Sequence, residues 1–327
     1  MAAGTCRKPL RGNRSLAQPD SGNLSARCEA RLGSALGAWS DRHAAYLLIV
    51  PTLLGVVLVD MYPLIYNALI SLQERKISTA HPAFIGLRNY TAVVRDPEMR
   101  HSLAVSMTFT IVSVVLSYVI GLVLALLLNR PIRGRGVLRA IFIVPWAMPA
   151  FVAALVWGWM YNDQFGIIPA LAKSAGIGPP PVLLSARYAL GALIAVMVWK
   201  SFPFQFVVLL AGLSAIDVEI LRAAEVDGAG AWQRFWRIVF PLLRPVSMVA
   251  VLLAAINAFQ YFPIPWILTQ GGPANATNVV PIAVYNTAFL GGDFGAAAAM
   301  ATMMFLFILM MGVLYLLQYI REVQQIG

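Results

Sequence analysis

Six long apolar segments constrain the fold of this chain more than any other feature of its sequence. They lie at about residues 44–72, 103–128, 137–161, 189–213, 242–268 and 294–319. Each exceeds the roughly 20 residues that cross a hydrocarbon core of about 30 Å. Because backbone amides in lipid must hydrogen-bond within the protein, each segment is expected to be a helix. The sequence therefore predicts an all-α, polytopic membrane protein with six transmembrane helices.

The composition agrees with this fold class and excludes several functions. Hydrophobic residues make up 60% of the 327 residues and charged residues 12%, whereas soluble domains are roughly 25% charged. The net charge is +10, but no basic stripe alternates with aromatics as on a nucleic-acid-binding surface. Two cysteines, Cys6 and Cys28, cannot form a disulfide framework or a zinc site. We expect no metal site and no nucleic-acid partner.

The distribution of basic residues predicts the orientation in the membrane. With the N-terminus inside, the inner segments hold 16 Lys and Arg residues and the outer loops hold 7. Basic residues of membrane proteins are enriched on the cytoplasmic side, so both termini are expected in the cytoplasm. The protein itself is expected in the cell membrane. Residues 1–43 contain no apolar region of a secretory signal and are expected to be a disordered cytoplasmic tail. Residues 44–320 form the expected membrane domain, and residues 321–327 a short cytoplasmic tail.

A charged stretch at about residues 217–241, here called the polar insert, separates two of the apolar segments. Residues 219–227 and 230–240 have the patterns of two short helices, with Gly228 and Gly230 at the turn between them. The second helix carries one apolar stripe at helical spacing, formed by Trp232, Phe235, Trp236 and Val239. The expected orientation places this amphipathic, membrane-edge element in the cytoplasm.

The polar insert resembles the EAA loop of the membrane subunits of binding-protein-dependent ABC importers. The matching positions and their neighbours are Arg222, Ala223, Ala224, Asp227, Gly228, Ala229, Phe235, Ile238 and Pro241. Two positions depart from the family pattern, because Arg222 stands where the family has Glu and Phe240 where Leu is usual. The resemblance implies that this loop couples the membrane helices to a cytoplasmic ATPase, and Arg222 puts the usual charge contact in question.

Further motifs resemble the carbohydrate-uptake branch of the same family over about residues 46–319. An FxGLxNY pattern is formed by Phe84, Gly86, Leu87, Asn89 and Tyr90. An LTxGGP turn is formed by Leu268, Thr269, Gly271, Gly272 and Pro273. The resemblance implies a permease that imports a sugar, expected to be a disaccharide or oligosaccharide, by alternating access.

The same resemblance implies the partners and the cofactors. A second permease subunit, expected to be a paralogue, would complete the membrane domain. Two copies of a cytoplasmic ATPase would bind ATP and Mg²⁺, so this chain needs no cofactor of its own, and an extracytoplasmic binding protein would deliver the solute. The lipid bilayer is the remaining partner.

Candidate residues of the substrate path lie in the fourth and fifth apolar segments. Lys200 is an ionisable residue near the middle of a span, which is a functional hypothesis by default. In the fifth segment, hydrogen-bonding groups alternate with aromatic rings, a combination that suits sugars. These candidates are Asn257, Phe259, Gln260, Tyr261 and Phe262. Ordinary helix packing explains the same residues nearly as well.

Alternatives to a sugar permease are left open by the residues. A glycerol-phosphate importer would need cationic groups along its path, and Lys200 offers only one. An ion-coupled secondary transporter should carry internal repeats and more intramembrane charge. No phosphate-binding GxxxxGK[ST] motif occurs, and the histidines His43, His81 and His101 lie outside the spans, so no catalytic residues are predicted.

Overall fold

The computed structural model describes residues 46, 49–78, 81–176, 178 and 181–326, so the predicted tail of residues 1–43 lies outside the described residues. The chain divides into two units, Met1–Leu64 and Ile65–Gly327, each described by itself. The described part of the first unit is helical from Ile49 and contains a π-helical turn, η1 (Val57–Met61). The second unit contains nearly all the remaining elements.

The described residues include five helices that are long and apolar enough to cross a membrane, and a sixth span if one bent pair of helices is a single crossing. The five are Ile49–Ser71, Pro97–Leu128, Ala189–Ser214, Ala231–Thr269 and Phe294–Tyr319. The main helices of the second unit are α4 (Pro97–Leu128), α8 (Ala189–Ser214), α11 (Phe240–Phe259) and α14 (Phe294–Ile326). The predicted all-α membrane fold is confirmed.

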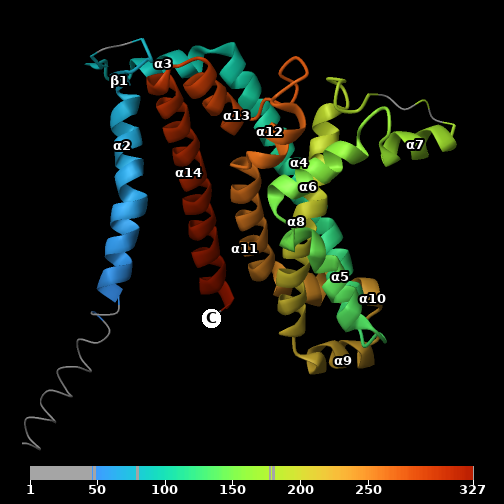
Figure 1. The fold of residues 1–327 in the computed structure, drawn as a ribbon. Coiled ribbons are helices and arrows are strands. Elements are labelled where there is room, and N and C mark those ends of the chain that lie inside the picture. The colour runs from blue at the N-terminus through green and yellow to red at the C-terminus, as the bar shows by residue number, and fades with distance from the viewer. Residues whose placement is uncertain (1–45, 47–48, 79–80, 177, 179–180, 327) are drawn as a thin grey trace, which may run out of the picture. The chain divides into compact units, whose positions relative to one another are not determined.

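The expectation of one uninterrupted helix at residues 137–161 was wrong. Two helices, α5 (Arg135–Ala147) and α6 (Ala150–Met160), occupy this segment and meet at an angle of 95° (Figure 1). Pro149 lacks the amide that would continue the helix, and it forces Met148 into an extended conformation at φ −68° and ψ 134°. Hydropathy alone does not predict such a break.

Shorter elements connect the long helices or form parts of the spans. They are α2 (Tyr62–Ser71), β1 (Gln73–Glu74), β2 (Ala83–Phe84), α3 (Arg88–Arg95), α7 (Ile167–Ser174), α9 (Val218–Val226), α10 (Ala231–Arg234), η2 (Phe235–Val239), α12 (Pro263–Thr269), α13 (Val280–Tyr285) and η3 (Asn286–Leu290). The strands β1 and β2 pair antiparallel, with Gln73 opposite Phe84. Asn89 Nδ2 donates to the carbonyls of Ser71, at 2.8 Å, and Gln73, at 2.9 Å. The FxGLxNY pattern thus closes the turn that follows α2.

The core of the second unit lies among α4, α8 and α11. Helix α4 packs most extensively on α8, where Phe109, Leu193 and Phe206 are fully buried. The two helices approach closely at Gly121. A Cβ atom there would lie only 2.7 Å from Gln205 Cβ and 2.8 Å from Phe206 N. Only glycine fits this crossing without displacing the backbone of α8.

Hydrogen bonds made by side chains connect the same three helices. Gln205 of α8 is fully buried, and its Nε2 donates to the carbonyl of Ala250 in α11 at 3.2 Å. The Tyr118 hydroxyl of α4 donates to Ser247 Oγ of α11 at 2.9 Å. Buried polar groups that are paired in this way fix the relative positions of helices in an apolar core.

Candidate functional site

The polar insert forms a helix followed by a tight turn. Asp217 caps α9, accepting a hydrogen bond from Glu219 N at 2.9 Å through its side chain. After the helix, Gly228 adopts φ +81°, and Ala229 N donates to the carbonyl of Ala224 at 2.9 Å. A left-handed residue just after a helix is commonly glycine, because a Cβ atom is strained in this conformation. Gly230 is extended at φ −64° and ψ 163°, so only one of the two predicted glycines makes the reversal.

The second half of the insert is continuous with the next span, which the sequence did not predict. α10 passes through η2 directly into α11, and Pro241 lies in the first turn of α11 without ending the helix. Of the expected apolar stripe, Val239 is buried and Phe235 packs against the core. Trp232 is 75% exposed and Trp236 is 45% exposed. The C-terminal end of this segment, at Val239, therefore packs in the helix bundle. Its first turn, at Trp232, faces outward.

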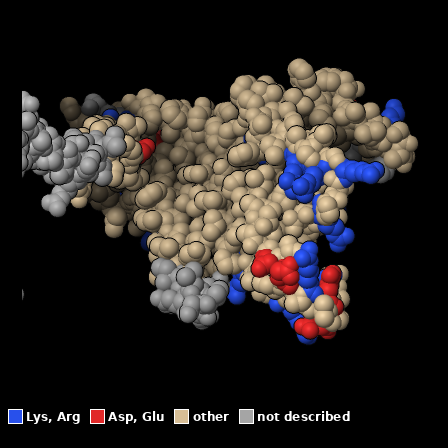
Figure 2. Space-filling view, turned by 90° about the horizontal axis from the view of Figure 1, so that it is seen from below, with Lys and Arg blue, Asp and Glu red and all other residues tan. Residues whose placement is uncertain are grey.

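Charged side chains gather over the polar insert, and Figure 2 shows acids and bases intermixed there. Arg222 Nη1 donates to Glu219 Oε1 at 2.6 Å, and both side chains are exposed. Arg234 pairs with Glu225 across the turn, which ties α10 to α9. Asp227 and Ala223 are exposed, Ala224 is buried, and Ala229 and Ile238 are half-buried. The insert is a pair of helices joined by an ion pair, and one side of it is exposed and charged.

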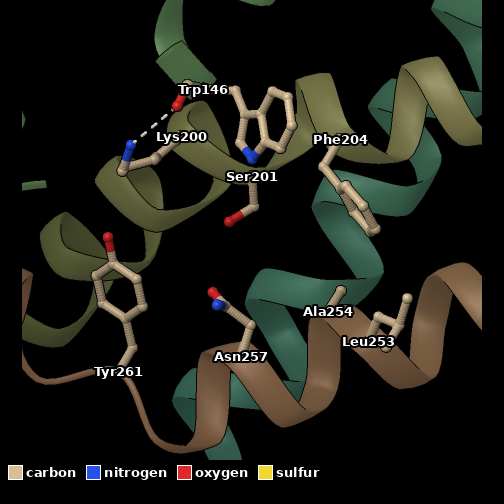
Figure 3. A pocket seen from close by; sticks show the side chains of 8 residues that line it. All are labelled: Trp146, Lys200, Ser201, Phe204, Leu253, Ala254, Asn257 and Tyr261. Carbon is tan, nitrogen blue, oxygen red and sulfur yellow. Dashed lines mark hydrogen bonds between the residues drawn. The ribbon is translucent and has the colours of Figure 1, made fainter. Parts of the chain in front are cut away.

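A second feature is a cavity of about 450 Å³ beside α8 and α11 (Figure 3). Its lining residues are Trp146, Lys200, Ser201, Phe204, Leu253, Ala254, Asn257 and Tyr261. Three of the predicted path residues, Lys200, Asn257 and Tyr261, therefore lie around one space. Aromatic and aliphatic side chains form most of the wall, and the polar groups are few. Such a lining is typical of a site for a small organic molecule.

The other three predicted path residues do not line this cavity. Phe259 is buried and packs on Phe307 with ring centroids 4.9 Å apart. Phe262 stacks on Trp266 at 5.4 Å. Gln260 is exposed in the turn that ends α11. Alternation of polar and aromatic residues along the sequence did not separate cavity-facing from core-facing positions, because the helix ends within this stretch.

Sequence reasoning also missed cavity residues. Phe204 follows Lys200 in α8 by four residues, so helical spacing from Lys200 could have found it, whereas Ser201, one residue on, carries no such signal. Trp146 belongs to the end of α5, and it reaches the cavity because the chain bends after it. The two prolines around this position, Pro145 and Pro149, were the available signal.

The Lys200 ammonium group joins the cavity to the break between α5 and α6. Its Nζ donates to the carbonyl of Met148 at 2.6 Å and lies 3.5 Å from the carbonyls of Pro145 and Trp146. These carbonyls end α5 and have lost the amide donors of a continuous helix. A cation at a helix C-terminus also interacts favourably with the helix dipole. Lys200 therefore stabilises the bend that brings Trp146 to the cavity.

Comparison with known proteins identifies the family. Residues 117–321 match the family described as "Binding-protein-dependent transport system inner membrane component". The chain belongs to this family. This inner membrane component is a multi-pass transport subunit, and the match runs from the second half of α4 to most of α14, including the polar insert and the cavity.

Relatives agree with this assignment over most of the chain. The chain is 38% identical to the trehalose/maltose transport system permease protein MalF of Thermococcus litoralis, over 85% of this chain and 94% of the relative. It is 32% identical to the sn-glycerol-3-phosphate transport system permease protein UgpA of Agrobacterium fabrum, over 81% of this chain and 90% of the relative.

A solved structure supports the fold of this inner membrane component. One chain of a bacterial ABC transporter involved in the import of the acidic polysaccharide alginate is similar with a TM-score of 0.75 and 18% identity. The similarity covers 88% of this chain and 99% of that one. At this identity the comparison establishes the fold.

Replacing Lys200 tests its role at the bend. We expect Lys200→Met to lower the maximal rate of solute uptake about tenfold or more, because the carbonyls at the end of α5 lose their cationic donor. Lys200→Arg should retain most of the rate, since a guanidinium also donates to carbonyls. Lys173→Met, on the exposed face of α7, is the matched control. Normal uptake by a stably inserted Lys200→Met protein would contradict this role.

Proposed function

We propose that this chain is one of two membrane-spanning subunits of an ATP-driven importer for a disaccharide or oligosaccharide. The observation that carries the proposal is the cavity, in which Asn257 and Ser201 lie among the rings of Trp146, Phe204 and Tyr261. Sugar hydroxyls need hydrogen-bonding partners, and the C–H faces of sugars pack against aromatic rings. The trehalose/maltose permease from Thermococcus litoralis, 38% identical, adds support.

A glycerol phosphate is the alternative solute, because the relative from Agrobacterium fabrum is named as a permease for such a compound. A phosphate would require cationic donors that are free to bind it. Among the eight residues that line the cavity, Lys200 is the one cation. Its ammonium group is already directed at the carbonyls of α5, closest to Met148 O at 2.6 Å. The neutral sugar is therefore favoured.

The polar insert is proposed to be the coupling element. In this proposal, α9 and its turn dock in a cleft of a cytoplasmic ATPase, and two ATPase copies bind ATP and Mg²⁺. The pair between Arg234 and Glu225 supports the idea, because it links α9 to α10 across the turn. The continuous helix from α10 through η2 into α11 would carry this movement to Asn257 of the cavity. The helix is continuous from Ala231 to Phe259, through the π-helical turn η2 and past Pro245, so movement of α10 would reach the cavity along one helix.

The proposal includes an orientation and further partners. Both termini and the polar insert would lie in the cytoplasm, in agreement with the excess of basic residues on that side. A second permease subunit, expected to be a paralogue, would complete the path, and a binding protein would deliver the sugar outside. Alternating access would open the cavity first to the outside and then to the cytoplasm.

Uptake of a labelled panel tests the function. Cells with and without this gene are compared for uptake of maltose, trehalose and glycerol 3-phosphate, and ATPase subunits are sought in the affinity-purified complex. We expect selective loss of one sugar, retained uptake of glycerol 3-phosphate, and a copurifying ATPase. Selective loss of glycerol 3-phosphate uptake would contradict the sugar assignment, and a transport-competent protein without an ATPase would contradict the coupled mechanism.

Gly228 provides a test of the coupling turn. We expect Gly228→Val to abolish uptake and weaken assembly, because a β-branched residue at φ +81° is strained by roughly 1–3 kcal/mol. Gly228→Asn should retain uptake, since asparagine tolerates the left-handed conformation. Arg222→Glu removes the exposed pair with Glu219 but keeps the turn, and near-normal uptake is expected.

The outcomes of these substitutions distinguish backbone strain at position 228 from a clash between its side chain and the partner ATPase. Normal uptake by Gly228→Val would rule out the coupling role of the turn. Equal loss in Gly228→Val and Gly228→Asn, with both complexes assembled, would show that the partner excludes any side chain there. In that case the strain explanation is wrong, although the turn still contacts the ATPase.

A further inference from the structure

A second, polar pocket lies at the other end of the membrane domain from the polar insert. It has a volume of about 230 Å³ and is lined by Asp96, Glu98, Met99, Asn278, Ala283, Asn286, Thr287 and Met300. These residues come from the start of α4, the segments at α13 and η3, and the first turns of α14. Figure 1 places α3 and α13 at one end of the second unit and α9 at the opposite end. The pocket is separate from the cavity beside Lys200.

Two amide oxygens of the residues that line this pocket lack a hydrogen-bond donor. Asn278 is 3% exposed, and its Oδ1 has no hydrogen-bond partner among the described residues. Asn286 Oδ1 is likewise buried and unpaired within the described chain. A buried acceptor that lacks a donor typically costs about 1–3 kcal/mol. Both oxygens are closed off from solvent in this structure, so a docking side chain reaches them only after the two amides turn toward the pocket.

Two carboxylates add negative charge at the same pocket. Asp96 uses Oδ1 to cap α4, accepting from Glu98 N at 2.9 Å, and Glu98 Oε1 accepts from Asn275 Nδ2 at 3.0 Å. Neither forms an ion pair with any residue that the structure describes. No Lys or Arg is found among the described residues that line the pocket. This lining favours a group that is cationic and rich in donors.

The residue types that line the pocket favour a basic side chain over a metal ion. A divalent cation needs oxygen ligands that converge at about 2.0–2.6 Å, and the described residues contain no group of three or more acidic, His or Cys residues that could hold one. A lysine or arginine side chain has a long aliphatic stem that can pack on apolar surface while its charged head is hydrogen-bonded. Met99 and Met300, both buried, supply such a surface beside the polar groups.

We propose that this pocket receives a Lys or Arg side chain of the extracytoplasmic binding protein when that protein docks. The proposal rests on the proposed function, which places this end of the domain outside the cell. Asp96 and Glu98 bind the charged head, and the amides of Asn278 and Asn286 turn toward it so that their buried oxygens gain a donor. Because oppositely charged groups chiefly raise the association rate, docking at this pocket weakens with added salt.

Charge-neutral variants test the pocket with little change in local structure. Asparagine at position 96 still caps α4, and glutamine at position 98 still accepts a hydrogen bond from Asn275. The Asp96→Asn/Glu98→Gln double variant is reconstituted as the complete transporter, and sugar-stimulated ATP hydrolysis is measured against the concentration of the transporter's own binding protein. Asp163→Asn, an exposed residue in the loop between α6 and α7, is the control.

We expect the double variant to raise the half-saturating concentration of the binding protein about tenfold, with the same maximal rate, and to flatten its salt dependence. A half-saturating concentration within twofold of the Asp163→Asn control would overturn the proposal. A fall in maximal rate with unchanged half-saturation would overturn it too, because the pocket would then have a structural role.

Two further outcomes identify another occupant. If added Ca²⁺ or Mg²⁺ shifts the half-saturation of the unmodified transporter, and the double variant has lost this shift, the pocket binds a metal and the proposal fails. If the double variant no longer copurifies with the second permease subunit, the pocket belongs to that interface and the proposal also fails. A wild-type complex that does not respond to the binding protein would instead contradict the proposed function itself.

Discussion

Backbone carbonyls inside a membrane need donors from the protein, and the break between α5 and α6 is where this chain meets that requirement with a side chain. The Lys200 ammonium group lies 2.6 Å from Met148 O and within 3.5 Å of two further carbonyls at the end of α5. This interaction gives the charge inside the span a role, because it stabilises the 95° bend that Pro149 causes. The bend also accounts for the cavity, because it brings Trp146 to Asn257 and Tyr261.

The core couples this region to the polar insert. Gly121 lets α4 approach α8, and Gln205 ties α8 to α11 through Ala250 O at 3.2 Å. Since α11 is continuous with α10, and α10 is paired with α9 through Arg234 and Glu225, a movement of the insert would reach the cavity through packed helices. The domain therefore combines a closely packed centre with functional groups at breaks, turns and helix ends.

The sequence predicted the features that depend on one helix at a time. Five spans follow from length and hydropathy, and the left-handed turn at Gly228 follows from the freedom of glycine. Features that depend on two helices were missed or only partly found. Phe259 and Phe262 looked like path residues and pack away from the cavity, whereas Trp146 reaches it only because of the bend at Pro149. Local composition does not specify which face of a helix meets which neighbour.

Accessibility of the cavity during transport tests the central claim most directly. Asn257→Cys is introduced after Cys6 and Cys28 are changed to serine, and its reaction with a charged thiol reagent is followed in the reconstituted transporter with and without sugar. Asp163→Cys, at an exposed position in the loop between α6 and α7, is the reference. The account predicts that the transported sugar slows modification at position 257 and leaves the modification rate at position 163 unchanged. Equal modification rates with and without sugar at position 257, in a transporter that remains active, would contradict it.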